Sequence, residues 1–189
     1  MADDKYVLVS KSKLNALANA TKEALGLNEK LTLDEMTEQV GNVRNKIILY
    51  QSVMTGNVVS FEDDDLNDIK SYAFAQCMDL IYVRLRNAKT LNVGTFYNCR
   101  KLKTVYLDKV TTMYGNIFQE TVLLEDVYFG HNGVVPLYAG VFLNSGSNAN
   151  GYVRVHVRPE YTSEYATATN WVDLINSGQI VIVGDYENE

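Results

Sequence analysis

The sequence is poor in the residues that build metal centres, disulfide frameworks and flexible linkers. Its 189 residues include only two prolines, two cysteines and two histidines. A zinc site usually takes four nitrogen or sulfur ligands, which this chain can hardly supply, and scarce proline argues against a Pro-rich linker protein. We therefore expect neither a metal nor a cofactor.

Basic charge and long apolar runs are lacking as well. Lys and Arg number 17 against 23 Asp and Glu, which gives a formal net charge of −6. Because binding phosphates requires a concentrated basic surface, we expect no nucleic-acid partner. The longest apolar runs, such as 47–50 and 179–183, are far too short to span a bilayer. The first residues contain no apolar segment typical of a secretory signal, so we expect none.

Catalytic motifs are missing too. The chain contains neither of the glycine-rich phosphate loops, G-x-x-x-x-G-K-[ST] and G-x-G-x-x-G, and no G-x-S-x-G nucleophile elbow. His131 and His156 have no partners in the order that a Ser-His-Asp or Cys-His site requires. We expect a protein that is not an enzyme.

What the sequence does contain is a 22-residue repeat. Apolar residues make up 47% of the chain, enough to bury a core, and between residues 69 and 130 they recur at a constant step. A step of this length lies within the ~20–29 residues of leucine-rich repeats. Five columns of equivalent positions show it: Phe74, Phe96 and Phe118; Cys77, Cys99 and Thr121; Leu80, Leu102 and Leu124; Val83, Val105 and Val127; Leu85, Leu107 and Phe129.

The spacing within each repeat predicts one short strand and one tight turn. Val83 and Leu85 are two residues apart, as in a strand with one buried face. Phe74, Cys77 and Leu80 are three apart, as in a tight helical or 3₁₀ turn over the same core. A single coil cannot bury its own apolar face, but stacked coils can, so we predict an α/β solenoid of about three full coils.

Imperfect coils are expected at both ends of these three. Upstream, Phe61 falls at the valine position but Asp63 at the leucine position. Downstream, Phe142 and residues 153–157 resemble a fourth coil with longer joints, in which we align Val153 with the valine column. The polar loop between them is predicted to be an exposed excursion.

The repeat motif A/T-F-x-x-C-x-x-L-x-x-V-x-L resembles the BspA-like class of leucine-rich repeats. In this chain it is followed by a closing element, VRVHVRPEYTSEYATATNWVDL, and by a last apolar strand at 179–183. The resemblance covers roughly residues 58–186. It implies a leucine-rich-repeat stack over residues 46–158 and a C-terminal helix-strand cap over residues 159–189.

Residues 1–45 follow a different pattern, that of two short helices. Gly26 and Gly41 are placed to end them, and Thr32 with Glu35 forms a T-x-x-E capping box. Two such helices bury too little to be stable alone, so they must dock on the first coil or on another chain. Their apolar residues are the candidates for attachment: Leu14, Leu17, Leu25, Leu33, Met36 and Val40.

The stretch YVLVSKSKLNALANATKEALGLNEKLTLDEMTEQVGNV is similar to an amino-terminal module of tail and other virion proteins from phages and prophages of Gram-positive bacteria. The resemblance implies that this part of the chain attaches the protein to a virus particle. It also implies other virion proteins as partners.

Two side-chain clusters are interpreted as structural. The acidic residues between 62 and 68 do not fit a calcium loop, because an EF-hand beginning at Asp63 would need Gly at its sixth position and Glu at its twelfth. We interpret them as a solvated acidic turn. Cys77 and Cys99 lie at equivalent places on adjacent coils, within reach of a disulfide, but Thr121 completes the column, so we favour free buried thiols.

One candidate binding surface remains, the outward face of the predicted strands. If Val83 and Leu85 point inward, their neighbours point outward, and one row reads Arg84, Tyr106, Tyr128 and Arg154. Tyr and Arg are enriched at interface hot spots. The alternative is that tyrosine is simply a good strand residue on a solvated sheet. The binding candidates are Tyr82, Arg84, Arg86, Tyr106, Asp108, Tyr128, Arg154 and His156.

These observations lead to the hypothesis of a non-enzymatic bacteriophage virion protein, a structural or adhesion component of the tail, fibre or capsid surface. It would be located in the virion after assembly in the bacterial host cytoplasm. The solenoid would display a binding surface for a host surface protein or glycan. A homo-oligomer is compatible with this hypothesis. The alternative is a bacterial leucine-rich-repeat module that binds protein or glycan and is not part of a virion.

Overall fold

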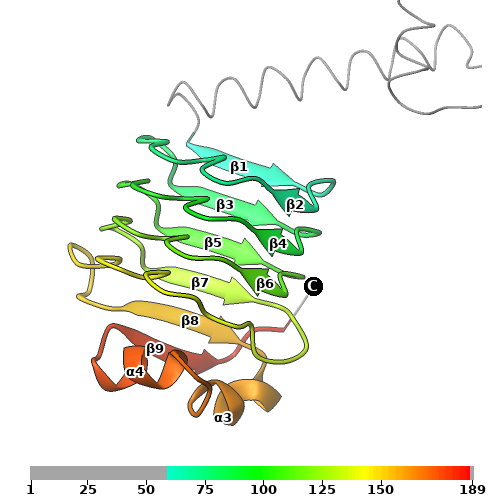
Figure 1. The fold of residues 1–189 in the computed structure, drawn as a ribbon, viewed down its shortest axis with the longest axis vertical. Coiled ribbons are helices and arrows are strands. Elements are labelled where there is room, and N and C mark those ends of the chain that lie inside the picture. The colour runs from blue at the N-terminus through cyan, green and yellow to red at the C-terminus, as the bar shows by residue number, and fades with distance from the viewer. Residues whose placement is uncertain (1–58, 188–189) are drawn as a thin grey trace, which may run out of the picture. The chain divides into compact units, whose positions relative to one another are not determined.

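The computed structural model describes residues 59–187, which form a stack of parallel strands (Figure 1). Six strands make one parallel sheet in the order β1-β3-β5-β7-β8-β9. Their bounds are β1 Ser60–Asp63, β3 Tyr82–Leu85, β5 Thr104–Leu107, β7 Asp126–Phe129, β8 Val153–Val157 and β9 Ile180–Gly184. The predicted module at 1–45 lies outside the described residues, and so do all six candidate attachment residues.

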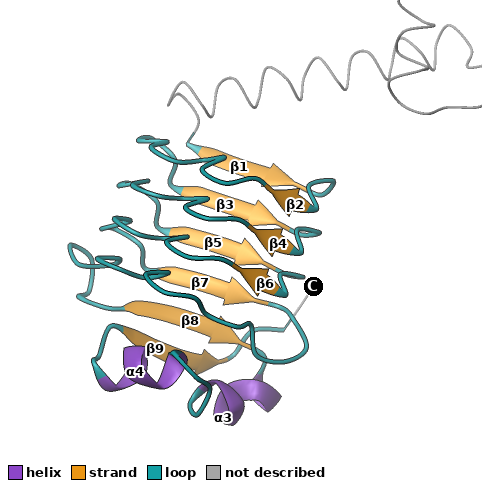
Figure 2. Cartoon of the chain, in the orientation of Figure 1, coloured by secondary structure: helices purple, strands orange, loops and turns teal. Residues whose placement is uncertain are grey.

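A second, smaller parallel sheet runs beside the first. It contains β2 (Asp68–Ile69), β4 (Thr90–Leu91) and β6 (Thr112–Met113). The helical elements of the described residues all lie between β8 and β9, as Figure 2 shows, and they are η1 (Pro159–Tyr161), α3 (Thr162–Tyr165) and α4 (Trp171–Asn176). Parallel sheets with few helices form the solenoid-like repeat fold that the 22-residue pattern predicts.

The strand register follows the 22-residue step from β1 to β7. Phe61 pairs with Val83, and Val83 pairs with Val105, so the inward positions of successive coils lie side by side. Asp63 occupies the leucine position opposite Leu85 and is buried. Its Oδ1 accepts hydrogen bonds from the backbone nitrogens of residues 65 and 66, at 2.7 and 2.9 Å, which offsets the loss of water around the carboxylate.

The turn side of each coil is held by stacked phenylalanine rings. Phe74 and Phe96 lie 5.3 Å apart between ring centroids, Phe96 and Phe118 lie 5.6 Å apart, and Phe118 and Phe142 lie 5.4 Å apart. The backbone repeats with them, since the Phe96 nitrogen donates to the carbonyl of Ile117 in the next coil at 2.9 Å. This column and the strand columns therefore enclose one continuous core.

Two residues in each turn adopt a left-handed backbone conformation with positive φ. The first column of such residues is Tyr72, Gly94, Asn116 and Gly140, and the second is Gln76, Asn98, Glu120 and Asn144. These conformations reverse the chain within a few residues, so that backbone nitrogens on the turn side can donate to the next coil. The Gln76 nitrogen, for example, donates to the Tyr97 carbonyl at 2.8 Å.

The fourth coil has a different register from the one predicted. Val155, and not Val153, pairs with Val127, so Arg154 lies opposite Asp126 and leaves the row in which we placed it. Valines 153, 155 and 157 are all buried, so alternation alone fits either register. The segment between Phe142 and β8 takes up four extra residues, since Phe142 and Val155 are 13 residues apart where Phe118 and Val127 are 9 apart. Within it, the Gly146 nitrogen donates to the Thr121 carbonyl of the preceding coil at 3.1 Å.

The helical segment covers the end of the core with two large aromatic side chains. Trp171 is fully buried, with its ring centroid 4.8 Å from that of Tyr165 and 6.0 Å from that of Phe129. The Trp171 Nε1 donates to the Val135 carbonyl at 2.8 Å, and the Val135 nitrogen donates to the Tyr165 hydroxyl at 3.1 Å. The burial raises the pKa of Tyr165 to about 12 although the bond from Val135 opposes this.

Candidate binding face

Flat side chains stack across the outward face of four strands. Arg84, Tyr106, Tyr128 and His156 occupy equivalent positions on β3, β5, β7 and β8, and we call them the aromatic row. The ring centroids of Tyr106 and Tyr128 are 4.2 Å apart, and those of Tyr128 and His156 are 4.1 Å apart, with interplanar angles of 5° and 13°. The Arg84 guanidinium carbon lies 5.2 Å from the centre of the Tyr106 ring, within cation–π distance.

Strand spacing explains this stacking. Neighbouring strands of a sheet lie about 4.8 Å apart, so planar side chains at equivalent positions meet face to face when they lean slightly. Tyr82 precedes Arg84 by two residues on β3 and therefore lies on the same face. Its ring makes a tilted contact with that of Tyr106, with 5.7 Å between the centroids. The face therefore carries a continuous aromatic and guanidinium surface of the composition that binding interfaces prefer.

Asp126 is the centre of an ionic cluster on the same face. Arg154 binds it in a bidentate manner, with Nε 2.6 Å from Oδ1 and Nη2 2.8 Å from Oδ2. The Nε2 atom of His156 lies 2.9 Å from the same Oδ1. Burial opposes ionisation of Asp126, but the hydrogen bonds and charges of its two partners outweigh it, so the pKa of Asp126 lies below its ordinary value. Arg154 is thus a partner of Asp126 rather than a member of the aromatic row.

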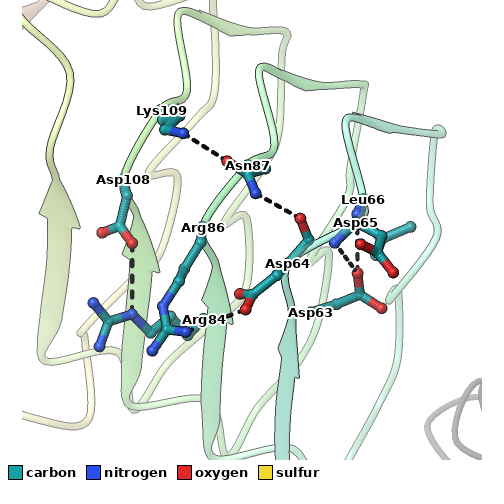
Figure 3. Close-up of polar contacts among 9 residues, drawn as sticks. All are labelled: Asp63, Asp64, Asp65, Leu66, Arg84, Arg86, Asn87, Asp108 and Lys109. Carbon is teal, nitrogen blue, oxygen red and sulfur yellow. Dashed lines mark hydrogen bonds and ion pairs between the residues drawn. The ribbon is translucent and has the colours of Figure 1, made fainter.

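A ladder of polar side chains follows the ends of the first strands, as Figure 3 shows. Arg86 Nη1 lies 3.2 Å from Asp64 Oδ2, and both side chains are largely exposed. Asn87 Nδ2 donates to the Asp64 carbonyl at 2.6 Å and Asn87 Oδ1 accepts from Lys109 Nζ at 2.7 Å. Arg86 lies at the border of the face, and its exposed ion pair contributes little to stability.

The C-terminal residues cover the middle of the aromatic row. After β9 the chain turns back along the stack toward the end of β7 (Figure 1). Tyr186 is only 8% exposed, and its ring centroid lies 6.0 Å from that of Tyr106 and 5.2 Å from that of Tyr128. Its hydroxyl donates to Asp108 Oδ1, while Arg84 Nε lies 3.5 Å from Asp108 Oδ2. Burial and the Asp108 carboxylate both raise the pKa of Tyr186.

A second contact holds the same segment. Asp185 Oδ1 lies 2.7 Å from His156 Nδ1, on the opposite side of the imidazole from Asp126. The Tyr186 nitrogen donates to the Val157 carbonyl at 3.1 Å. Sequence reasoning missed Asp185 and Tyr186, because they lie outside the repeat and nothing in their spacing connects them to residue 108.

The structure brings the predicted binding residues together on one face but changes the interpretation of two. Asp108 and His156 were expected to point into solvent, and both are buried. The reason is the C-terminal segment, whose carboxylate and phenol bind them. Their role in binding stays a prediction, as it does for the partly exposed residues of the face, Tyr82, Arg84, Tyr106, Tyr128 and Arg154, and for the exposed Arg86.

The two cysteines form part of the core. Both are free and buried, and the Cys99 thiol donates to the Phe74 carbonyl with a sulfur–oxygen distance of 2.8 Å. Thr121, at the next position of the column, donates instead to the Phe118 carbonyl of its own coil at 2.6 Å. The neighbouring Cys99 lowers the pKa of Cys77, whereas the neighbouring Cys77 and burial raise the pKa of Cys99. A small side chain that can donate to a carbonyl is what this column requires.

Across 59–187 no group of three or more His, Cys, Asp and Glu side chains is placed to hold a metal ion. The helices of this segment include none that is long and apolar enough to cross a membrane. A hollow of about 270 Å³ lies between residues 137–143 and α4, but the amide nitrogens of Asn170 and Gln179 that line it already donate to backbone carbonyls.

Comparison with known proteins identifies the repeat. A family model described as a BspA type leucine rich repeat region matches residues 50–148, in six copies. No curated protein and no solved structure matches the chain. The matched range covers more than half of the sequence and ends in the loop before β8, so β8, the helical segment and the C-terminal residues lie beyond it.

Proposed function

Because the chain belongs to the BspA-type leucine-rich repeat family, we propose that it is a non-enzymatic binding module that holds a protein partner on the outward face of its strands. A leucine-rich repeat region suggests protein binding, since stacked coils present an extended surface to a partner. The aromatic row is the observation that carries the proposal. It places arginine and tyrosine, the residue types enriched at interface hot spots, side by side on one face.

The part of the face that is open to a partner lies toward the first strands. Tyr82, Arg84 and Tyr106 are partly exposed there, and the exposed side chains of Asp64 and Arg86 border them. An aromatic centre with a charged border is the usual anatomy of a protein interface. The partner would therefore bury rings against this centre and form ion pairs at its border.

Site-specific photo-cross-linking tests this proposal. A benzophenone amino acid placed at Tyr82 should cross-link to a partner in the cells or particles that contain the protein. The same amino acid at Tyr72, which is 55% exposed but lies on the turn side, is the matched control and should give no specific product. Products from position 72 alone would show that the partner binds the other face and would overturn the assignment.

We propose further that this module is carried on a bacteriophage virion, with residues 1–45 attached to the particle and the solenoid directed outward. The similarity of the amino-terminal stretch to modules of phage tail and virion proteins supports this placement. Mass spectrometry of purified particles tests it directly. Recovery of the protein from host cells but never from particles would favour the alternative, a bacterial binding module that recognises a protein or glycan outside any virion.

A further inference from the structure

The C-terminal segment shows what the outward face can hold. Its contacts are of several kinds, because Tyr186 presents a ring to two tyrosines, a hydroxyl to Asp108 and a backbone nitrogen to Val157. The preceding Asp185 presents a carboxylate to His156. The buried hydroxyl and the backbone nitrogen of Tyr186 thus both have partners, as in a specific peptide site, whereas the Asp185 side chain is 56% exposed.

The carboxylate of Asp108 makes the site selective for a phenol. Asp108 is buried, and an ionised carboxylate only accepts hydrogen bonds, so the group opposite it must donate one. The hydroxyl of Tyr186 does so, while the Arg84 side chain balances the charge from the other side. A phenylalanine in the same place would fill the space and leave one oxygen of a buried carboxylate without its donor.

The imidazole of His156 makes the site selective for an acidic residue before the tyrosine. Its two nitrogens face two carboxylates, Asp126 on one side and Asp185 on the other. A carboxylate only accepts hydrogen bonds, so the imidazole nitrogen that faces position 185 serves as a donor to an acidic residue before the tyrosine. Asp126 and Arg154 are the other charged groups of this cluster, and they already satisfy each other in a bidentate pair.

The segment that occupies this site is short. The last strand ends at Gly184, and the contacts described above are made by the next two residues, Asp185 and Tyr186. Because this segment is covalently joined to β9, it competes with any outside peptide, which binds only to chains whose own segment has left the site.

We propose that the aromatic row, with Asp108, is a recognition site for a partner segment in which a tyrosine directly follows an acidic residue, and that the chain's own Asp185–Tyr186 occupies it until such a segment binds. This inference rests on the proposed function and names the partner's chemistry. An extended acidic segment containing Asp-Tyr or Glu-Tyr is the ligand.

Peptide titration of the full chain tests the inference. The receptor is the ¹⁵N-labelled Tyr186→Ala chain, in which the site is vacated, and the probe is the peptide VGDYENE, the sequence of residues 183–189. Saturable amide shifts are expected at Tyr106, Tyr128 and His156. The wild-type chain, whose own segment competes, should bind the peptide at least about tenfold more weakly.

Peptide variants supply the matched controls. VGDFENE keeps the ring but has no hydroxyl, so it should bind about tenfold or more weakly than VGDYENE. VGNYENE lacks the acidic residue before the tyrosine, whose side chain is 56% exposed in the chain's own segment, so it should bind about two- to fivefold more weakly. VGDAENE should not bind. Equal shifts with the tyrosine and alanine peptides, or no shifts up to about 10 mM, would overturn the inference.

A second receptor covers the case in which the Tyr186→Ala chain does not fold. The Tyr186→Phe chain keeps the ring contacts and loses only the bond to Asp108, so VGDYENE should bind it about tenfold more tightly than it binds the wild-type chain; equal affinities would contradict the proposal. Cross-linking at Tyr82 without peptide binding would support the proposed function and refute this inference. Peptide binding without a cross-linked partner would support the inference and refute the placement of the partner beside Tyr82.

Discussion

The phenylalanine column gives the sharpest test of the fold. Phe96 is fully buried between Phe74 and Phe118, with ring centroids 5.3 and 5.6 Å away. The substitution Phe96→Ala removes the ring from the middle of this column. Because the coils on both sides are hydrogen-bonded to the same turn, the neighbouring rings have little freedom to close the space.

Two contributions determine the expected loss of stability. Returning the ring to water in the unfolded chain accounts for about 2 kcal/mol. The space left behind, about 100 Å³ if the coils do not move, adds ~2 kcal/mol at ~24 cal/mol per Å³. The free energy of unfolding should therefore fall by about 4 kcal/mol, within the ~3–5 kcal/mol usual for Phe→Ala in a core.

Urea unfolding measures this change, with the fluorescence of the single, fully buried Trp171 as the signal. The control is Met78→Ala in the turn of the preceding coil. Met78 is 45% exposed, so this substitution should change the free energy of unfolding by less than about 0.5 kcal/mol. A loss below about 1.5 kcal/mol for Phe96→Ala would show that the column collapses freely or does not form, and would refute the reasoning.

Three further predictions concern the loop before β8, the ionic cluster and the helical segment. Gly146 has a φ of +64°, and a Cβ there would lie 2.9 Å from a backbone carbonyl oxygen, so Gly146→Ala should lower the free energy of unfolding in urea by about 2–4 kcal/mol. The control is Gly151→Ala, where φ is +80° and no atom lies within 4 Å of the added Cβ, and the loss should be only ~1 kcal/mol. Asp126 has a lowered pKa because its partners Arg154 and His156 outweigh burial, so the stability that it contributes is present above the ordinary carboxyl pKa and is lost as pH falls through the lowered one. As the pH is lowered from about 5 to 2, the thermal midpoint of Asp126→Asn should therefore fall less steeply than that of the wild-type chain, and equal slopes would contradict this. Burial raises the pKa of Tyr165 to about 12, so its contribution is complete below the ordinary tyrosine pKa and is lost as pH rises through about 12. Tyr165→Phe should cost ~1–3 kcal/mol at pH 7, where the Val135 nitrogen loses its acceptor, and should reduce the loss of stability at alkaline pH.

The strand and turn columns were predictable because each recurs three times at one step. Val83, Val105 and Val127 lie in register, and the phenylalanines that accompany them stack as the shared spacing requires. Repetition supplies its own check, since a wrong alignment of one coil would conflict with the two others. The matching family model extends over the same residues.

The fourth coil and the C-terminal segment were not predictable, for different physical reasons. Alternating valines fit β8 in either of two registers, and the contacts made in the observed one, such as that of Arg154 with Asp126, lie outside the valine pattern. The contact of Tyr186 with Asp108 spans 78 residues and occurs once, so no period reveals it. The outward positions of Tyr106 and Tyr128 followed from strand alternation, whereas their use in binding remains a prediction.

Turn conformations were predictable only where the residue type indicates them. Gly94 and Asn98 are types that readily adopt positive φ, but Tyr72, Gln76 and Glu120 adopt it as well. Those three residues have no intrinsic preference for it. They are held in place by the coil that follows, which accepts their backbone hydrogen bonds. The neighbouring coil therefore determines what the local sequence does not.

The regular register of the strands also acts as a ruler for anything that lies on them. Side chains at equivalent positions recur every ~4.8 Å along the stack, whereas alternate side chains of an extended peptide recur every ~6.6 Å. The two steps are incommensurate, so a peptide crossing the strands at right angles meets one coil in phase and the next out of phase. A peptide that follows a strand has no such mismatch, because it keeps its side chains on one or two coils. The direction in which a partner crosses this face is thus restricted by the coil spacing itself, whichever residues form the contact.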